Sequence, residues 1–173
     1  MEVKYKISGR GELLHRFIKK MENDEHLLRL LYYNPLDKDG NYVDFTDPNL
    51  PNILDFEEEK LDQIRNDLIR KSEKNDDIAE EKKSIIFVYY GKSRPVFNNH
   101  TQVKREVIMT ILSHNDFAFD YRIEEICDRL DSLFVGEKRI GLGEVTSGIS
   151  FKREAPKEYL AFEQKYIITD KRK

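Results

Sequence analysis

The sequence predicts an α+β fold, in which a mostly antiparallel four-stranded sheet is packed by an amphipathic helix and preceded by N-terminal helices. Two observations lead to this prediction. Apolar residues recur at helical spacing through the first 71 residues, whereas from Ser84 onward short apolar runs rich in β-branched and aromatic residues appear. These later runs are interrupted by one long helical pattern, an order typical of helices that cover one face of a sheet.

The N-terminal helices are expected within residues 1–75. Residues 11–22 place Leu, Phe, Ile and Met side chains at helical spacing. Asp24 is a suitable N-cap for a second helix with the sequence EHLLRLLYY, which the Asn-Pro pair at 34–35 should end. Residues 55–71 then predict a third helix.

Residues 35–54 should form an extended loop or arm, because they contain three prolines, one glycine and many Asp and Asn residues. Its stretch DKDGNYVDFTD, at 37–47, raises the alternative of a calcium loop. An EF-hand loop needs glycine at its sixth position and glutamate at its twelfth. Counted from Asp37, the glycine is fourth and the twelfth residue is Pro48. We therefore expect a polar loop.

The C-terminal part, residues 84–170, predicts the sheet and its helix. Helical spacing is clearest from Asp120 to Val135, with Asp120 as the expected cap and Gly136 as the expected end. A polar connection, residues 72–83, should precede this part. The four expected strands, pairing in order as two hairpins, are 84–90, 102–113, 139–151 and 159–170.

Composition and charge favour a single domain, residues 1–173, with a strongly charged surface. The chain is 39% hydrophobic and 36% charged, and 30 basic against 33 acidic residues give a net charge of -3. A basic excess, which is typical of nucleic-acid binders, is missing. Mixed charges of this kind suit a surface that pairs with other proteins.

The single cysteine and the absence of long apolar runs indicate a soluble protein made inside the cell. One cysteine, Cys127, forms no internal disulfide, and its place on the apolar stripe of a helix predicts a core residue rather than a catalytic thiol. The N-terminal stretch MEVKYKISGRGELLHRF lacks the apolar run of a signal peptide. No run of about 18 apolar residues occurs, so no membrane span is expected.

No motif predicts a catalytic, cofactor or metal site, and we expect none. Neither HExxH nor CxxC occurs. A metal site from His100, His114 and Asp116 is conceivable, but surface polar residues at strand ends are the favoured interpretation. The GLG stretch at 141–143 lacks the third glycine of a dinucleotide fingerprint and indicates a strand bulge or twist. The paired glutamates at 57–59, 80–81 and 124–125 suggest solvated faces.

Four successive stretches carry a resemblance to a known group of proteins. They are VKREVIMTILSHNDF, DYRIEEICDRLDSLFVG, RIGLGEVTSGISF and KEYLAFEQKYIITD, within residues 84–170. This succession resembles tail-terminator, tail-completion and neck proteins of tailed bacteriophages. The resemblance implies a virion structural protein, made in the host cytoplasm, that forms a homo-oligomeric ring, a hexamer, at the head-tail neck. Its partners would be the tail tube protein and the head-closure or connector proteins, with phage DNA passing through the lumen without specific binding.

Three alternatives stay open at this stage. A head-closure or neck protein would occupy the next layer toward the head. A small metal-dependent nucleic-acid enzyme would use Lys104, Glu106, His114 and Asp116, and should cleave when Mg²⁺ or Mn²⁺ is added. An interaction module of host origin would be a monomer that forms a one-to-one complex.

Overall fold

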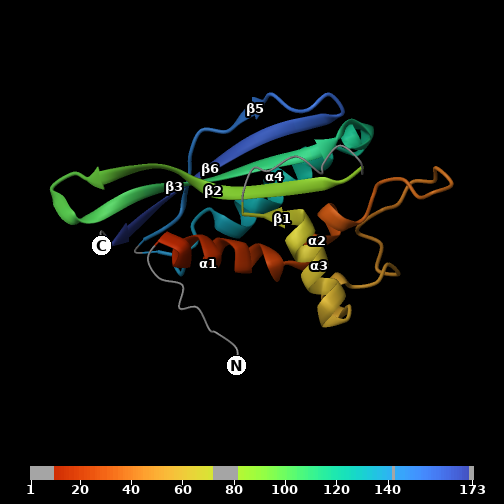
Figure 1. The fold of residues 1–173 in the computed structure, drawn as a ribbon, viewed down its shortest axis with the longest axis horizontal. Coiled ribbons are helices and arrows are strands. Elements are labelled where there is room, and N and C mark those ends of the chain that lie inside the picture. Colours follow the sequence, from red (N-terminus) through yellow and green to blue (C-terminus); the bar gives the residue numbers. More distant parts are fainter. Residues whose placement is uncertain (1–9, 72–81, 142, 172–173) are drawn as a thin grey trace.

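The computed structural model describes residues 10–71, 82–141 and 143–171. It confirms the α+β class: four α-helices and a mostly antiparallel sheet make up the described part of the chain. Figure 1 shows the helices gathered on one side of the three long strands. Side chains from both the N-terminal helices and the sheet, from Leu13 to Ile168, form one apolar core between these two layers.

The N-terminal helices form close to where the sequence predicts them. Their bounds are Arg10–Glu22 for α1, Glu25–Tyr32 for α2 and Glu58–Leu68 for α3, with a short 3₁₀ turn, η1, at Ile53–Asp55. The predicted cap of α2 is confirmed, since the Asp24 carboxylate accepts a hydrogen bond of 2.8 Å from the backbone N–H of Leu27. The apolar side of α2 is completely buried: Leu27, Leu28, Leu30 and Leu31.

The sheet has the strand order β1-β2-β3-β6-β4, and β5 also pairs with β6. Its long strands are β2 (Ser84–Val96), β3 (Asn99–His114) and β6 (Tyr159–Lys171), and its short ones are β1 (Ile69–Arg70), β4 (Thr146–Ser147) and β5 (Phe151–Arg153). β1 is parallel to β2 and pairs only with Ile86 and Phe87, so in the described part of the chain the rest of that β2 edge has no strand beside it. All other pairs are antiparallel.

The β2–β3 hairpin is confirmed and is longer than predicted. Most of residues 91–101, expected to be a connecting loop, continue the two strands, and the turn is the Phe97-Asn98 pair, where Asn98 has φ 57°. The extension reaches past the helices (Figure 1). It therefore buries little, and its sequence lacks the apolar alternation by which strands are recognised.

The strand predicted over residues 139–151 forms only in part, although its predicted pairing with the last strand is confirmed. Only the short β4 and β5 pair there, both with β6. At the start of this segment the chain lies close to β6: a Cβ on Gly141 would lie 2.5 Å from the Ile168 Cδ1 atom and 2.7 Å from the Thr169 carbonyl oxygen. Gly141 therefore lets the chain lie against β6 instead of marking a bulge in a strand.

Helix α4, Arg122–Phe134, confirms the predicted helix but begins differently. Tyr121, with φ 54°, occupies the capping position, and no side chain caps this end. The predicted cap, Asp120, instead accepts hydrogen bonds from the Arg122 guanidinium at 2.6 and 3.0 Å. The helix ends as predicted, since Gly136 follows it with φ 80°. A 3₁₀ segment, η3 (Asn115–Asp120), connects β3 to α4.

The core is built around three aromatic rings. Phe17 of α1, Phe134 of α4 and Tyr166 of β6 are all fully buried, with ring centroids 4.8 Å apart for the two phenylalanines and 5.4 Å apart for Phe134 and Tyr166. The opposite face of the sheet carries a smaller buried cluster: Ile85, Phe87, Leu112, Tyr159 and Ala161. The long strands are thus apolar on both faces near their centres.

Candidate functional site

Residues 35–54, hereafter the arm, are held to the helical layer by one buried aromatic ring. Phe45 is 9% exposed, and its ring meets the His26 imidazole edge-on at 5.5 Å. The Arg122 guanidinium lies 5.2 Å from the same ring. Arg29 of α2 donates a hydrogen bond of 2.6 Å to the Asp47 carbonyl oxygen. Tyr33, at the C-terminal end of α2, donates one of 2.7 Å to the Pro51 carbonyl oxygen. The base of the arm is therefore packed onto α2.

Arg122 is the residue that joins the arm to α4. Its side chain is 1% exposed and donates hydrogen bonds to the carbonyl oxygens of Leu30, at 2.7 Å, and Tyr33, at 2.9 Å. These carbonyls belong to the C-terminal turn of α2, which has no helical partners for them. Arg122 was not among the predicted functional residues, although it lies four residues before Ile126 on the apolar stripe of the helix. A charged residue on such a stripe indicates that its charge has a buried partner.

The aspartates of the arm stabilise its own turns. Asp37 accepts hydrogen bonds from the backbone N–H groups of Asp39 and Asn41 at 2.9 and 2.8 Å, and Asp44 accepts one from Thr46 at 2.8 Å. Side-chain hydrogen bonds from Asn41 and Thr46 lower the pKa of Asp37 and Asp44. These contacts fit the predicted polar loop rather than a calcium loop. Across residues 10–71, 82–141 and 143–171, no group of three His, Cys, Asp or Glu side chains is placed to hold a metal ion.

Exposed apolar side chains gather beside the arm. We call Leu36, Tyr42, Phe119 and Tyr121 the aromatic patch; they are 39%, 58%, 52% and 69% exposed. The rings of Tyr42 and Phe119 pack edge-on with centroids 6.2 Å apart, and an isolated antiparallel bridge pairs Leu36 with Tyr42. The patch thus combines the arm with η3 and the start of α4.

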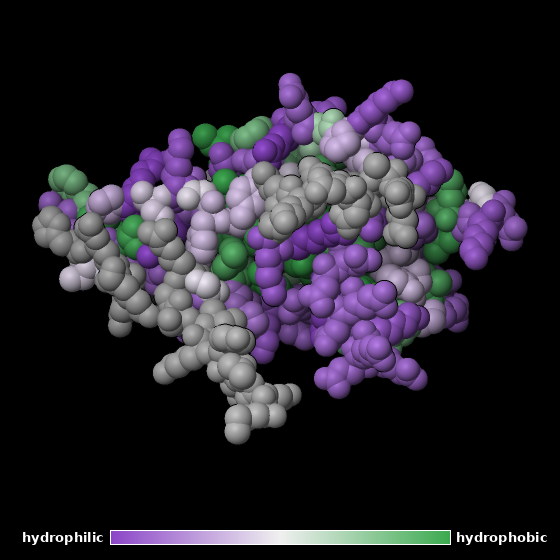
Figure 2. All heavy atoms as spheres, in the orientation of Figure 1, coloured by the Kyte–Doolittle hydropathy of each residue, from purple (hydrophilic) through white to green (hydrophobic). Residues whose placement is uncertain are grey.

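A second exposed apolar group lies at the end of the β2–β3 hairpin. We call residues 91–104 the hairpin tip; they contain three basic residues and no acidic one. Phe97, in the turn, is 90% exposed, and Lys92, Arg94 and Lys104 are exposed around it. Figure 1 shows that the hairpin tip and the arm lie at opposite ends of the long axis, and Figure 2 shows hydrophobic atoms at the hairpin end.

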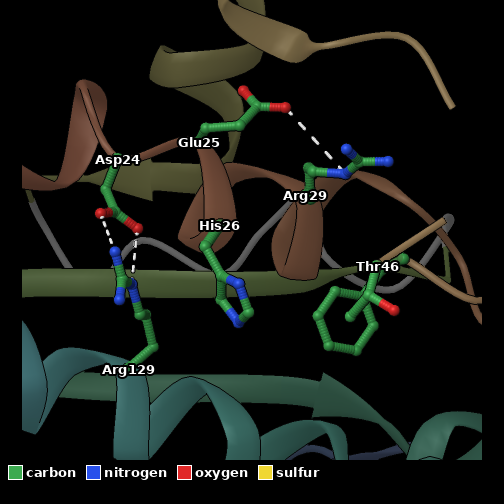
Figure 3. Close-up of a pocket in the computed structure, with 7 residues that line it drawn as sticks. Asp24, Glu25, His26, Arg29, Thr46 and Arg129 are labelled. Carbon is green, nitrogen blue, oxygen red and sulfur yellow. Dashed lines mark hydrogen bonds and ion pairs between the residues drawn. The ribbon is translucent and has the colours of Figure 1, made fainter. Parts of the chain in front are cut away.

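A hollow of about 400 Å³ lies between α2, the arm and α4 (Figure 3). Arg129 of α4 donates to the Asp24 carboxylate, with a distance of 2.8 Å from Nε, and this hydrogen bond raises the Arg129 pKa. Arg29 faces Glu25 at 4.0 Å. Both arginines of the wall are thus balanced by acids, so the hollow offers no concentrated positive charge to an anion. Its lining residues are Asp24, Glu25, His26, Arg29, Phe45, Thr46 and Arg129.

The residues of the nuclease alternative do not come together. Glu106 accepts hydrogen bonds from the Lys92 N–H and the Arg94 guanidinium, at 3.2 and 3.1 Å. Asp116 instead pairs with Lys82, at the other end of β3. Eight residues of strand separate Glu106 from His114, which corresponds to roughly 26 Å.

Of the three members of the conceivable metal site, His114 and Asp116 are neighbours, with 3.7 Å between Nδ1 and the carboxylate, whereas His100 lies far from both. His100 is at the start of β3 and His114 at its end, a span of roughly 45 Å. The expectation that His114 is a surface residue is wrong: it is 8% exposed, packs against Tyr159, and its Nδ1 accepts a hydrogen bond of 3.2 Å from the Asp116 N–H.

Three further predictions about side chains can be compared with the structure. Cys127 is confirmed as a core residue, and burial, with Asp131 nearby, raises its pKa to about 12. The solvated faces at 57–59 and 124–125 are confirmed, because these glutamates are exposed. Residues 80–81 and most of the connection 72–83 lie outside the described residues. Within the described chain, no helix has the length and apolar character needed to cross a membrane.

The fold and its surfaces define an α+β protein with exposed aromatic groups at two opposite ends and no metal-holding cluster in the described residues. The chain belongs to the YomW family, whose model matches residues 24–168. This is a phage-associated family, so the expected bacteriophage connection is confirmed at that level. No curated protein matches the sequence.

Proposed function

We propose that the protein is a structural subunit of a tailed-phage virion, a tail-terminator or tail-completion protein that forms a ring between the tail tube and the head connector. The observation that supports this proposal best is the pair of exposed apolar surfaces, the hairpin tip and the aromatic patch. They lie at opposite ends of the molecule and differ in their residues. Membership in a phage-associated family is consistent with the proposal.

A closed ring is built from head-to-tail contacts between two different surfaces, and this chain offers two different surfaces. Each subunit of a cyclic ring uses one surface against a different surface of its neighbour, whereas a two-fold dimer uses the same surface twice. Exposed aromatic clusters on soluble proteins mark interaction sites, because contiguous apolar surface is costly to leave in water. Two such surfaces facing away from one another suit a subunit with a neighbour on each side.

The mixed charge of the chain suits the other expected partners. With a net charge of -3, the protein has no overall attraction for DNA phosphates, so DNA can pass through a lumen without being held. The charged rims of the ring would contact the tail tube protein on one side and the head-closure or connector proteins on the other. Six copies would follow the resemblance to tail-terminator rings.

The test is the mass of the purified protein by light scattering behind a sizing column, with negative-stain imaging of the same fractions. Tail tubes are added to a second sample. We expect rings in solution, or rings that appear on the head-proximal ends of tail tubes. A protein that stays monomeric and does not bind tail tubes would contradict the proposal.

A further inference from the structure

We propose that the hairpin tip of one copy binds the aromatic patch of the next copy, with Phe97 inserted among Tyr42, Phe119 and Tyr121. This inference rests on the proposed ring, because it assigns the two surfaces that would close it. The occupant of the patch is therefore a second copy of this chain. Four features support this pairing: the charge of the two surfaces, their apolar groups, the attachment of the hairpin tip to the sheet, and the position of the two surfaces.

The charges of the two surfaces are complementary. The hairpin tip exposes Lys92, Arg94 and Lys104 and contains no acidic residue. Glu106, just outside the tip, balances Arg94 at 3.1 Å, so the positive charge of this end rests on Lys92 and Lys104. The first part of the arm, residues 35–47, contains four aspartates against one lysine. Hydrogen bonds within the turns lower the pKa of Asp37 and Asp44, so these carboxylates stay ionised at neutral pH. A basic end therefore meets an acidic end when copies are arranged head to tail.

The apolar groups also match in kind. Phe97 is 90% exposed and isolated at its turn, whereas the patch offers several rings together. Tyr42 and Phe119 already pack edge-on, with their centroids 6.2 Å apart, and a third ring would add contacts of the same type. An aromatic anchor in a well-packed pocket, surrounded by contacts that exclude water, is the usual composition of an interface hot spot.

The hairpin tip is held to the sheet before any contact forms. Strand pairing along the hairpin extends to Pro95–Val103 and Val96–Asn99, next to the turn, with register shifts after Tyr90 and after Pro95. Arg105, 6% exposed, fixes the base of this extension through a hydrogen bond of 3.0 Å to Asp170 of β6. Since little conformational freedom remains to be lost on binding, the contact has a low entropic cost.

Pairing of like surfaces is disfavoured by the same charges. Two hairpin tips brought together would face Lys92, Arg94 and Lys104 against their own copies, and two arms would face their aspartates. Like charges in close contact oppose such a two-fold pair. Since the tip and the patch lie at opposite ends of the long axis, the remaining arrangement repeats from copy to copy (Figure 1).

The first test uses two variants that each lack one surface. A hairpin variant carries Lys92→Glu, Phe97→Ala and Lys104→Glu, and a patch variant carries Tyr42→Ala and Phe119→Ala. We expect self-association of each to weaken at least about tenfold, the loss expected for hot-spot aromatics. Mixing them should give one-to-one pairs that do not grow, because only one intact tip and one intact patch remain. Ile149→Ala, at a side chain 78% exposed between β4 and β5, is the matched control and should assemble like the wild type.

The second test traps the contact covalently and does not depend on strong association. Single variants Phe97→Cys and Tyr42→Cys are mixed under mild oxidation. Random collision would make half of the disulfide dimers mixed, whereas the proposed contact predicts that mixed dimers dominate. The native Cys127, 9% exposed, stays out of the reaction because it is buried. A random distribution would overturn the proposal, as would variants that self-associate like the wild type.

The two proposals fail in different ways. If wild-type rings form on tail tubes and the hairpin variant forms them equally well, the contact assigned here is wrong and the proposed function stands. If mixed disulfide dimers dominate but the wild type does not bind tail tubes, the contact stands and the function is wrong.

Discussion

Replacing Arg122 with methionine should destabilise the protein strongly. The Arg122 side chain is 1% exposed and the side chain of its partner Asp120 is 4% exposed. Both hydrogen bonds from Arg122 to Asp120 go to the Oδ2 atom, and Oδ1 has no hydrogen-bond partner in the described part of the chain. The change would leave this carboxylate buried without its counter-charge and the Leu30 and Tyr33 carbonyls without a donor. Breaking a buried pair by removing one partner costs about 3–5 kcal/mol.

The assay is urea unfolding followed by circular dichroism, since the chain contains no tryptophan. We expect the free energy of unfolding to fall by about 3–5 kcal/mol, and the melting temperature by roughly 10 °C. The double variant Arg122→Met with Asp120→Asn should recover part of this loss, because the uncompensated charge is then gone. Such recovery separates the charge effect from a loss of packing.

Arg94→Met is the matched control. Arg94 also pairs with a glutamate, Glu106, at 3.1 Å, but its side chain is 71% exposed. Exposed pairs contribute about 0.2–1 kcal/mol, so this variant should unfold almost like the wild type. A loss below about 1 kcal/mol for Arg122→Met would refute the interpretation that this arginine joins α2, the arm and α4.

Three further predictions concern single side chains. Gly141→Ala should lower the free energy of unfolding by about 1–3 kcal/mol in the same urea assay, because its Cβ would lie 2.5 Å from the Ile168 side chain; an unchanged value would show that β6 moves freely. Cys127, with a pKa of about 12, should react with a thiol reagent at pH 8 only after urea is added, and fast labelling of the folded protein would contradict its burial. The Lys20 ammonium lowers the pKa of Glu137 from its usual 4.5 to about 2. The ionised Glu137 therefore stabilises the fold at pH values above 4.5, and this contribution is lost as the pH falls toward 2. Lys20→Met should therefore reduce the loss of stability over that pH range, and an unchanged acid profile would refute the ion pair.

Sequence patterns predicted the features that depend on neighbours a few residues away. Asp24 reaches the Leu27 N–H three residues on, and the β2–β3 hairpin pairs segments joined by a two-residue turn. The apolar stripe of α4 likewise repeats within one helix. Such local signals are complete within a short window of sequence, which is why these elements lie where they were expected.

The features that were missed depend on residues far apart in the chain. Asp120 looked like a helix cap because its partner, the guanidinium of Arg122, is held by carbonyls 89 and 92 residues away. Residues 139–151 looked like a strand because the sequence does not show that Gly141 must lie against β6. The aromatic patch could not be predicted either, since Tyr42 and Phe119 meet only after folding.

The outer edge of β2 has a consequence for how copies of the protein avoid each other. Beyond Ile86 and Phe87 this edge has no strand beside it in the described part of the chain, and an open edge can template fibrous growth. Lys92, Arg94 and Pro95 lie along that edge, and proline cannot donate the hydrogen bond that an incoming strand would need. Charged side chains and a proline on an edge strand oppose the addition of a further strand, so this part of the edge resists sideways stacking of sheets.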